Sequence, residues 1–168
     1  MTNFTIAVLV RNEFGVLNRV TSMFRRRRFN INSLTVSETE SPGLSRITVS
    51  SSGLETDKNQ LINQLYKLPD VCSIKELNIT ESVTCELMLI KVKNEPETRA
   101  DVRDAAQAFG AKTVDYTRDS VTMRLTGTSR EIDAFVDLMR DFTILEICRT
   151  GTASLEKGSG ILRQNLNL

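Results

Sequence analysis

The sequence predicts an α+β protein made of two ferredoxin-like domains in tandem, and two observations and one general rule support this prediction. Strand-like and helix-like segments follow in the order β-α-β-β-α-β within residues 1–80. The same order recurs in residues 81–168, although the residues themselves do not visibly repeat. Right-handed crossovers leave few other topologies for this order, so each half should form an antiparallel sheet with both helices on one face.

The first half of the N-terminal domain is predicted to form a strand followed by a helix. The apolar, β-rich run 4–10 ends at a polar turn that contains Gly15. The apolar residues that follow recur at helical spacing on one face: Val16, Leu17, Val20, Met23 and Phe24. The arginines at 25–28 should close this helix, where cations suit the negative end of the helix dipole.

A hairpin, a helix and a strand complete this domain. The segments 31–37 and 45–51 alternate in polarity around a Pro-Gly turn, which predicts a hairpin. Thr56 or Asp57 should cap the second helix. The apolar run 71–79 then supplies the last strand.

The C-terminal domain repeats these elements. Its strands are expected at 83–93, 112–116, 121–125 and 144–148. The first of them is apolar on both faces, which predicts a central, covered strand. Pro96 should open one helix, and the capping-box pattern Thr128-Ser129-Arg130-Glu131 should begin the other. The polar tail from about residue 152 should be mobile.

Composition narrows the functional classes. The formal net charge of +1 gives no electrostatic reason to expect nucleic acid or an anionic membrane as partner. Cys72, Cys85 and Cys148 each lie in a strand-like run, so we interpret them as reduced core residues of a cytoplasmic protein. No apolar run is long enough for a membrane span, and the N-terminus shows no secretory signal. Histidine is absent, which removes the commonest general acid or base and the commonest transition-metal ligand.

The turn between the first strand and the first helix, Asn12–Leu17, is the candidate binding site. Gly15 lets a ligand approach the backbone closely, and the uncovered N–H groups of the helix suit a carboxylate. Asn12 offers a donor and an acceptor without adding charge, so the turn suits a zwitterionic amino acid. Alternatively, Gly15 only makes a tight turn and Asn12 only caps the helix.

Several motifs resemble one family over roughly residues 4–163. The run 10–20 is similar to the first motif of ACT domains, which are amino-acid-binding regulatory modules. Further runs resemble the acetolactate (acetohydroxyacid) synthase small subunit: 29–36, 44–48, 86–92, 125–128, 133–135 and 149–151. Phe14 and Asn18 depart from the usual pattern, since proline or a small polar residue is common at the first position and serine at the second.

This resemblance implies a non-catalytic, allosteric regulatory subunit of branched-chain amino-acid biosynthesis. It implies a homodimer formed through the ACT domains, with valine, leucine or isoleucine bound at the dimer interface. The implied effector contacts are Asn12, Gly15, Val16 and Leu17 of one protomer and Asn30 and Ile31 of the other. Such a subunit activates the catalytic (large) subunit and mediates feedback inhibition by valine.

The resemblance also implies where the cofactors lie. Thiamine diphosphate, Mg and FAD are expected on the catalytic partner only, with no cofactor and no metal in this chain. The C-terminal domain is expected to support the dimer and to contact that partner.

Other functions stay open as alternatives. RNA-binding ferredoxin-like modules stack bases on aromatic residues of the central strands, but 45–51 holds no aromatic residue and 4–10 holds only Phe4. An enzyme would need paired carboxylates, whereas Glu13 and Glu86 are scattered over the elements. A free-standing ACT-type amino-acid sensor that acts on another partner is the third alternative.

Overall fold

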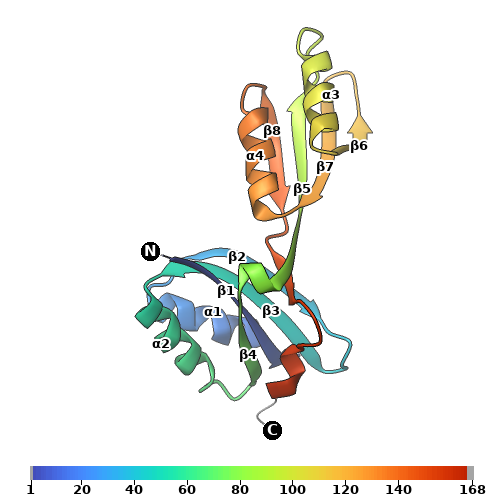
Figure 1. Ribbon diagram of the computed structural model, residues 1–168. Coiled ribbons are helices and arrows are strands. Elements are labelled where there is room, and N and C mark those ends of the chain that lie inside the picture. Colours follow the sequence, from blue (N-terminus) through green and yellow to red (C-terminus); the bar gives the residue numbers. More distant parts are fainter. Residues whose placement is uncertain (1, 166–168) are drawn as a thin grey trace. The chain divides into compact units, whose positions relative to one another are not determined.

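The computed structural model describes residues 2–165 and confirms the predicted α+β class with two β-α-β-β-α-β arrangements (Figure 1). The chain divides into two compact units. One unit comprises the residues up to Thr84 together with those from Thr152 onward, and the other is Cys85–Gly151.

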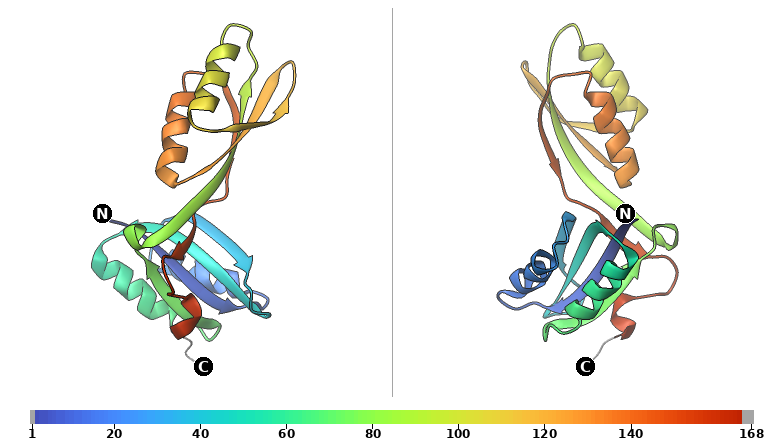
Figure 2. Two further views of the ribbon diagram at one scale, coloured as in Figure 1. Left: turned by 45° about the vertical axis from the view of Figure 1, so that its right-hand side comes forward. Right: turned by 90° about the vertical axis from the view of Figure 1, so that its left-hand side faces the viewer.

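The first unit is an antiparallel sheet covered on one face by two helices (Figure 2). Its elements are β1 (Thr2–Arg11), α1 (Val16–Arg26), β2 (Ile31–Glu38), β3 (Leu44–Gly53), α2 (Glu55–Leu65) and β4 (Val71–Leu77). The strand order is β2-β3-β1-β4, so β2 is an edge strand. The core between sheet and helices is aliphatic and aromatic, and its fully buried members include Ile6, Val8, Val20, Phe24, Ile47, Val49, Leu61 and Leu65.

The C-terminal segment covers the other face of this sheet. It contains β9 (Ala153–Glu156), which pairs with β5, and a short 3-10 helix, Leu162–Asn165. Leu162 packs with buried Ala7, Leu9 and Leu77.

Polar contacts hold the same segment in place. The Arg46 Nη2 group donates to the Ser154 carbonyl (2.6 Å), and the Ser73 hydroxyl donates to the Leu162 carbonyl (2.8 Å). The structure therefore differs from the predicted boundary at 80 and from the predicted mobile tail. The physical reason is that β1 is apolar on both faces, so its second face needs a cover that the tail provides.

The second unit repeats the topology with strand order β6-β7-β5-β8. Its elements are β5 (Ser82–Lys93, which begins in the first unit), α3 (Arg99–Ala108), β6 (Lys112–Tyr116), β7 (Ser120–Gly127), α4 (Ser129–Met139) and β8 (Ile144–Arg149). Both helices cover one face, as Figures 1 and 2 show. On the opposite face Leu89 is 37% exposed, so the predicted covering of both faces of this strand is wrong for the single chain.

Of the predicted starts of α4 and α2, the first is confirmed and the second is wrong. The capping box is confirmed, because the Thr128 side chain accepts from the Glu131 N–H and the Glu131 side chain accepts from the Thr128 N–H. Helix α2 instead begins at Glu55 with Leu54 as its N-cap, so the predicted caps Thr56 and Asp57 lie inside the helix.

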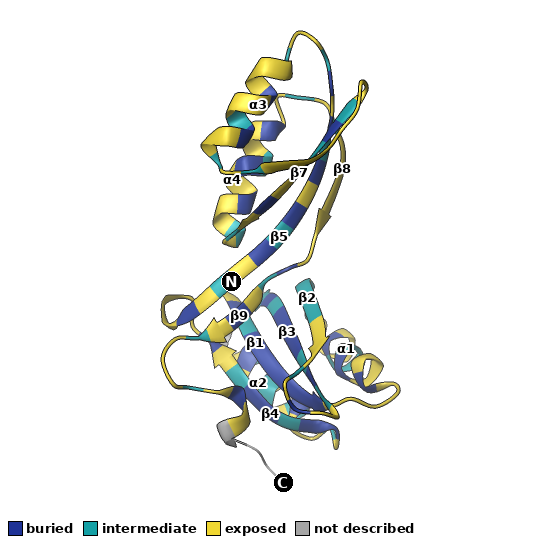
Figure 3. Ribbon diagram, turned by 90° about the vertical axis from the view of Figure 1, so that its right-hand side faces the viewer, coloured by how far each residue is buried: buried dark blue, intermediate teal, exposed yellow. Residues whose placement is uncertain are grey.

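The start of α3 and the burial of the cysteines also differ from the predictions. Pro96 precedes α3, whose N-cap is Thr98. All three thiols are free, and half-buried Cys72 packs against the core cluster that contains Leu162, but Cys85 and Cys148 are exposed and are not core residues. Cys85 and Cys148 lie on strands that have only one covered face, which explains their exposure. Figure 3 shows how exposed residues follow β8 and the outer sides of α3 and α4.

Candidate functional site

The loop between β1 and α1 is anchored to its neighbours through the backbone. The Arg11 N–H donates to the Asp70 carbonyl (2.9 Å), and the Asn12 N–H donates to the Gly43 carbonyl (2.8 Å). Gly15 is the N-cap of α1, with φ of +80°, a left-handed conformation that L side chains rarely adopt. The loop is thus fixed at the C-terminal end of β1, and the backbone conformation at its last position favours glycine.

The first turn of α1 presents unpaired donors. The Val16 N–H reaches the Glu13 carbonyl at 3.3 Å, and the Arg19 N–H reaches the Gly15 carbonyl at 3.0 Å. Between them, the N–H groups of Leu17 and Asn18 have no hydrogen-bond partner within residues 2–165. No acidic residue lies in this turn. These features suit a small anion, because the helix dipole and the free N–H groups both favour negative charge.

Arg19 adds a positive charge beside Gly15. Its Nε donates to the Asp70 carboxylate at 2.6 Å, and Asp70 is buried whereas the Arg19 side chain is 42% exposed. A Cβ built on Gly15 would lie 3.2 Å from Arg19 Nη1. The guanidinium therefore reaches the space directly over the glycine. The sequence prediction did not include Arg19, although its spacing of four from Gly15 places it one helical turn away.

Asn12 points toward the hairpin formed by β2 and β3. Its Nδ2 donates to the Glu38 carboxylate at 3.0 Å, and both side chains are exposed. The alternative that Asn12 caps α1 is wrong, because Gly15 is the N-cap and no side chain caps this helix. Glu38 was also missed, since its place beside Asn12 depends on the pairing of β2 with β3.

Val16 and Leu17 differ in exposure. Val16 is buried in the core, whereas Leu17 is 42% exposed. Of these two residues, only Leu17 has a side chain that a ligand in the loop can reach, and the Val16 N–H already donates to the Glu13 carbonyl.

Asn30 and Ile31 lie at the other end of β2. Ile31 pairs with Ser51, whereas Glu38 pairs with Ser45. The Asn30 carbonyl accepts from the Ser51 hydroxyl at 2.6 Å. At about 3.3 Å per residue, the length of β2 separates Ile31 from Glu38 by about 23 Å. One chain therefore does not bring the two predicted halves together.

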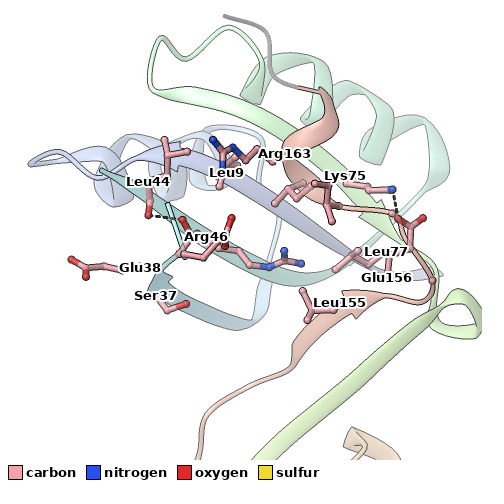
Figure 4. A pocket seen from close by; sticks show the side chains of 16 residues that line it. Leu9, Ser37, Glu38, Leu44, Arg46, Lys75, Leu77, Leu155, Glu156 and Arg163 are labelled. Atoms are coloured by element: carbon pink, nitrogen blue, oxygen red, sulfur yellow. Dashed lines mark hydrogen bonds and ion pairs between the residues drawn. The ribbon is translucent and has the colours of Figure 1, made fainter. Parts of the chain in front are cut away.

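A cavity of about 500 Å³ lies elsewhere in the first unit, between the sheet and the C-terminal segment (Figure 4). Leu9 and Leu77 form part of its wall, and Arg46 and Lys75 reach from the sheet toward the segment. Lys75 forms an ion pair with Glu156. Burial lowers the pKa of Arg46, and the charge of Glu40 partly offsets this effect. No pattern in the sequence indicated this cavity, because its roof comes from the distant C-terminus.

Residues 2–165 contain neither a metal-ligand cluster nor a membrane-spanning helix. No group of three or more Cys, Asp or Glu side chains is placed to hold a metal ion. No helix in this part of the chain is long and apolar enough to cross a membrane.

Comparisons with known proteins agree over nearly the whole chain. Residues 6–73 match the model of the AHAS small subunit-like ACT domain, and residues 85–158 match that of the small subunit of acetolactate synthase. The probable acetolactate synthase small subunit of Archaeoglobus fulgidus is 46% identical over 92% of this chain and 97% of that protein. The acetolactate synthase small subunit of Bacillus subtilis is 42% identical over 92% of this chain and 90% of that protein.

A solved structure supports the same family and fold. The crystal structure of the acetolactate synthase small subunit from Thermotoga maritima superposes with a TM-score of 0.87 at 31% identity. The superposition covers 95% of this chain and 100% of that one.

Proposed function

This chain belongs to the family of acetolactate synthase small subunits, and from that membership we propose that it regulates a catalytic large subunit by binding a branched-chain amino acid. The proposed effector is valine, leucine or isoleucine. The proposed outputs are activation of the catalytic subunit and feedback inhibition when the effector is bound.

The positions of Ile31 and Glu38 at opposite ends of β2 carry the proposal. β2 is an edge strand, and among the described strands it pairs only with β3, so a further strand can be added beside it. A two-fold axis through the middle of β2 would pair it antiparallel with β2 of a second copy. Ile31 of the partner subunit would then lie beside Glu38, and hence beside the Asn12 loop. The homodimer therefore completes two sites that one chain leaves open.

The chemistry of such a site matches a zwitterion. The effector carboxylate would accept from the N–H groups of Leu17 and Asn18, with the Arg19 charge nearby. Its ammonium group would donate to the Asn12 carbonyl oxygen or to Glu38. Its aliphatic side chain would contact Ile31 of the partner subunit.

Inhibition then follows from differential binding. An effector that binds one dimer geometry better than another shifts the population toward that geometry. The coupling to the catalytic partner is a free-energy difference, so inhibition need not be complete. We assign thiamine diphosphate, Mg and FAD to the catalytic partner only, and we assign dimer support and contact with that partner to Cys85–Gly151.

Calorimetry of the full chain with valine, leucine and isoleucine tests the site. Gly15→Asp places a second carboxylate beside Arg19 and the free N–H groups, so we expect it to abolish binding. Gly15→Asn is the matched control, because Asn and Asp tolerate the left-handed backbone similarly and differ in charge. Normal valine binding by Gly15→Asp would show that the effector binds elsewhere.

A mixed dimer tests whether the site is shared between protomers. In a heterodimer of Gly15→Asp with Asn30→Ala, one interface site carries both substitutions and the other carries neither. We expect each homodimeric variant to bind weakly and the heterodimer to regain about half of the wild-type stoichiometry. No regain would place both halves of the site within one protomer.

A further inference from the structure

A groove in the second unit lies between α3 and the hairpin of β6 and β7, elements that are labelled in Figure 1. Its volume is about 540 Å³, within the range of small-molecule sites. Every residue that lines it belongs to Cys85–Gly151, so the groove is separate from the Asn12 loop of the first unit.

The floor of the groove is apolar. Val102 and Ala106 of α3 and Val121 and Met123 of β7 form it, and all of them are buried core residues. Helix α3 lines the groove with the small side chains of Ala100 and Ala106 as well as with arginines, and every residue of β6 is exposed. An apolar body of a few carbon atoms can therefore lie against this floor.

The rim is positively charged. Lys93, Arg99 and Arg103 line the groove, and no acidic residue does. The Lys93 ammonium pairs with Glu95 at 2.7 Å, and Arg103 pairs with the neighbouring Asp104 at 3.3 Å. The Arg99 guanidinium has no carboxylate within 4.0 Å in the described part of the chain, so its charge is available to a ligand.

Buried Asn94 positions the polar groups at this end of the groove. Asn94 is 6% exposed, and its Nδ2 donates to the Thr117 carbonyl at 2.6 Å. Its Oδ1 accepts from Arg99 Nε at 2.8 Å and from the Tyr116 hydroxyl at 3.4 Å. One buried amide thus holds side chains from α3 and β6. It occupies Arg99 Nε, whereas neither terminal nitrogen of Arg99 has a hydrogen-bond partner among residues 2–165, so both can bind an anion.

We propose that this groove binds a small organic carboxylate, with the carboxylate held by Arg99 and the apolar body lying on Val102, Ala106 and Met123. A guanidinium with two free terminal nitrogens matches the two oxygens of a carboxylate. A protein partner is the less favoured occupant, because a stable interface buries about 800 Å² on each side and the apolar floor consists of four side chains.

Methyl NMR of the full chain labelled at methionine tests the proposal directly. The probe is 3-methylbutanoate, which lacks the ammonium group that an amino-acid site requires. The Met123 methyl reports on the groove, and Met88 and Met139 are buried in the same core outside it. We expect a saturable shift of Met123 alone, and little or none with the uncharged 3-methylbutanol.

Substitution of Arg99 provides the matched comparison. Arg99→Gln should weaken binding of 3-methylbutanoate by about tenfold or more, as expected for loss of a charge-assisted hydrogen bond. Arg130→Gln, an exposed arginine of α4 outside the groove, should leave it unchanged.

Three results with small molecules would overturn the assignment. They are no saturable shift of Met123, a shift that Arg99→Gln leaves unaltered, and a shift that only inorganic phosphate produces. A Met123 shift caused only by the catalytic subunit would make the groove a protein-docking surface and would equally exclude the carboxylate.

Discussion

Replacing Arg149 with methionine should strongly destabilise the second unit. Arg149 ends β8, and its Nε and Nη2 donate to the two carboxylate oxygens of Glu86 at 2.5 and 3.1 Å. Glu86 lies on β5 and is 4% exposed, and it also accepts from Ser129 at the start of α4. The pair therefore ties two strands and a helix together just before the chain leaves the unit at Gly151.

The size of the effect follows from the burial of each partner. Removing one partner of a buried ion pair costs about 3–5 kcal/mol, because the other charge stays buried without compensation. The Arg149 side chain is 34% exposed, which lets water reach the site, so we expect about 2–3 kcal/mol. The hydrogen bonds to Glu86 raise the pKa of Arg149 above its usual range, so the guanidinium keeps its charge wherever the unit is folded.

Calorimetric or denaturant unfolding of the full chain measures this loss. For a domain of this size, 2–3 kcal/mol corresponds to a Tm lowered by about 10–20 °C. Asp133→Asn is the control, because Asp133 also pairs with Arg149 (2.7 Å) but is 61% exposed and should contribute at most about 1 kcal/mol. If Arg149→Met and Asp133→Asn proved equally mild, the pair with Glu86 would not be what holds β5, β8 and α4 together.

Two further predictions concern the C-terminal segment and the capping box. Leu162→Ala should cost about 2–3 kcal/mol and speed amide hydrogen exchange at Leu9 and Leu77, since Leu162 is 9% exposed and packs on both; exchange unchanged from wild type would mean that the segment does not cover the sheet in solution. The hydrogen bonds from Thr128 lower the pKa of Glu131, so their contribution to α4 is complete above the ordinary carboxyl pKa and is lost as the pH falls through the lowered value. An NMR titration of Glu131 should show this lowered pKa, and Thr128→Ala should return it only part of the way to the ordinary value, because the backbone N–H at residue 128 still donates to the carboxylate. An unshifted wild-type titration would contradict it.

The element order could be predicted from sequence because its signals are local. The Pro42-Gly43 turn fixes the β2–β3 hairpin, and Gly43 has the left-handed φ of +79° that such a turn needs. The capping box at Thr128 likewise acts over three residues. The position of the C-terminal segment could not be predicted, because Leu162 packs with Leu9, a residue near the other end of the sequence. No local pattern encodes that contact. A hint was present in Ala7 and Leu9, apolar residues on the face of β1 that the helices do not cover.

The candidate site was predicted in part for the same reason. Gly15 and Asn12 sit in one short motif, so their proximity is guaranteed by the sequence. Glu38 comes from the hairpin and Asp70 from the start of β4, and only the sheet brings them to the loop. Neither could be inferred from spacing along the chain.

Those distant contacts explain why the loop is suited to hold a ligand. Asp70 holds both elements that flank the loop: its carbonyl accepts from the Arg11 N–H at the end of β1, and its carboxylate accepts from Arg19 in α1. The hairpin binds the loop itself twice, through the Gly43 carbonyl and Glu38 to Asn12. Because these contacts exist in the single chain, the free N–H groups of Leu17 and Asn18 are preorganised for ligand binding. Less conformational entropy is then lost on binding, and the proposed dimer needs to supply only the apolar half of the site.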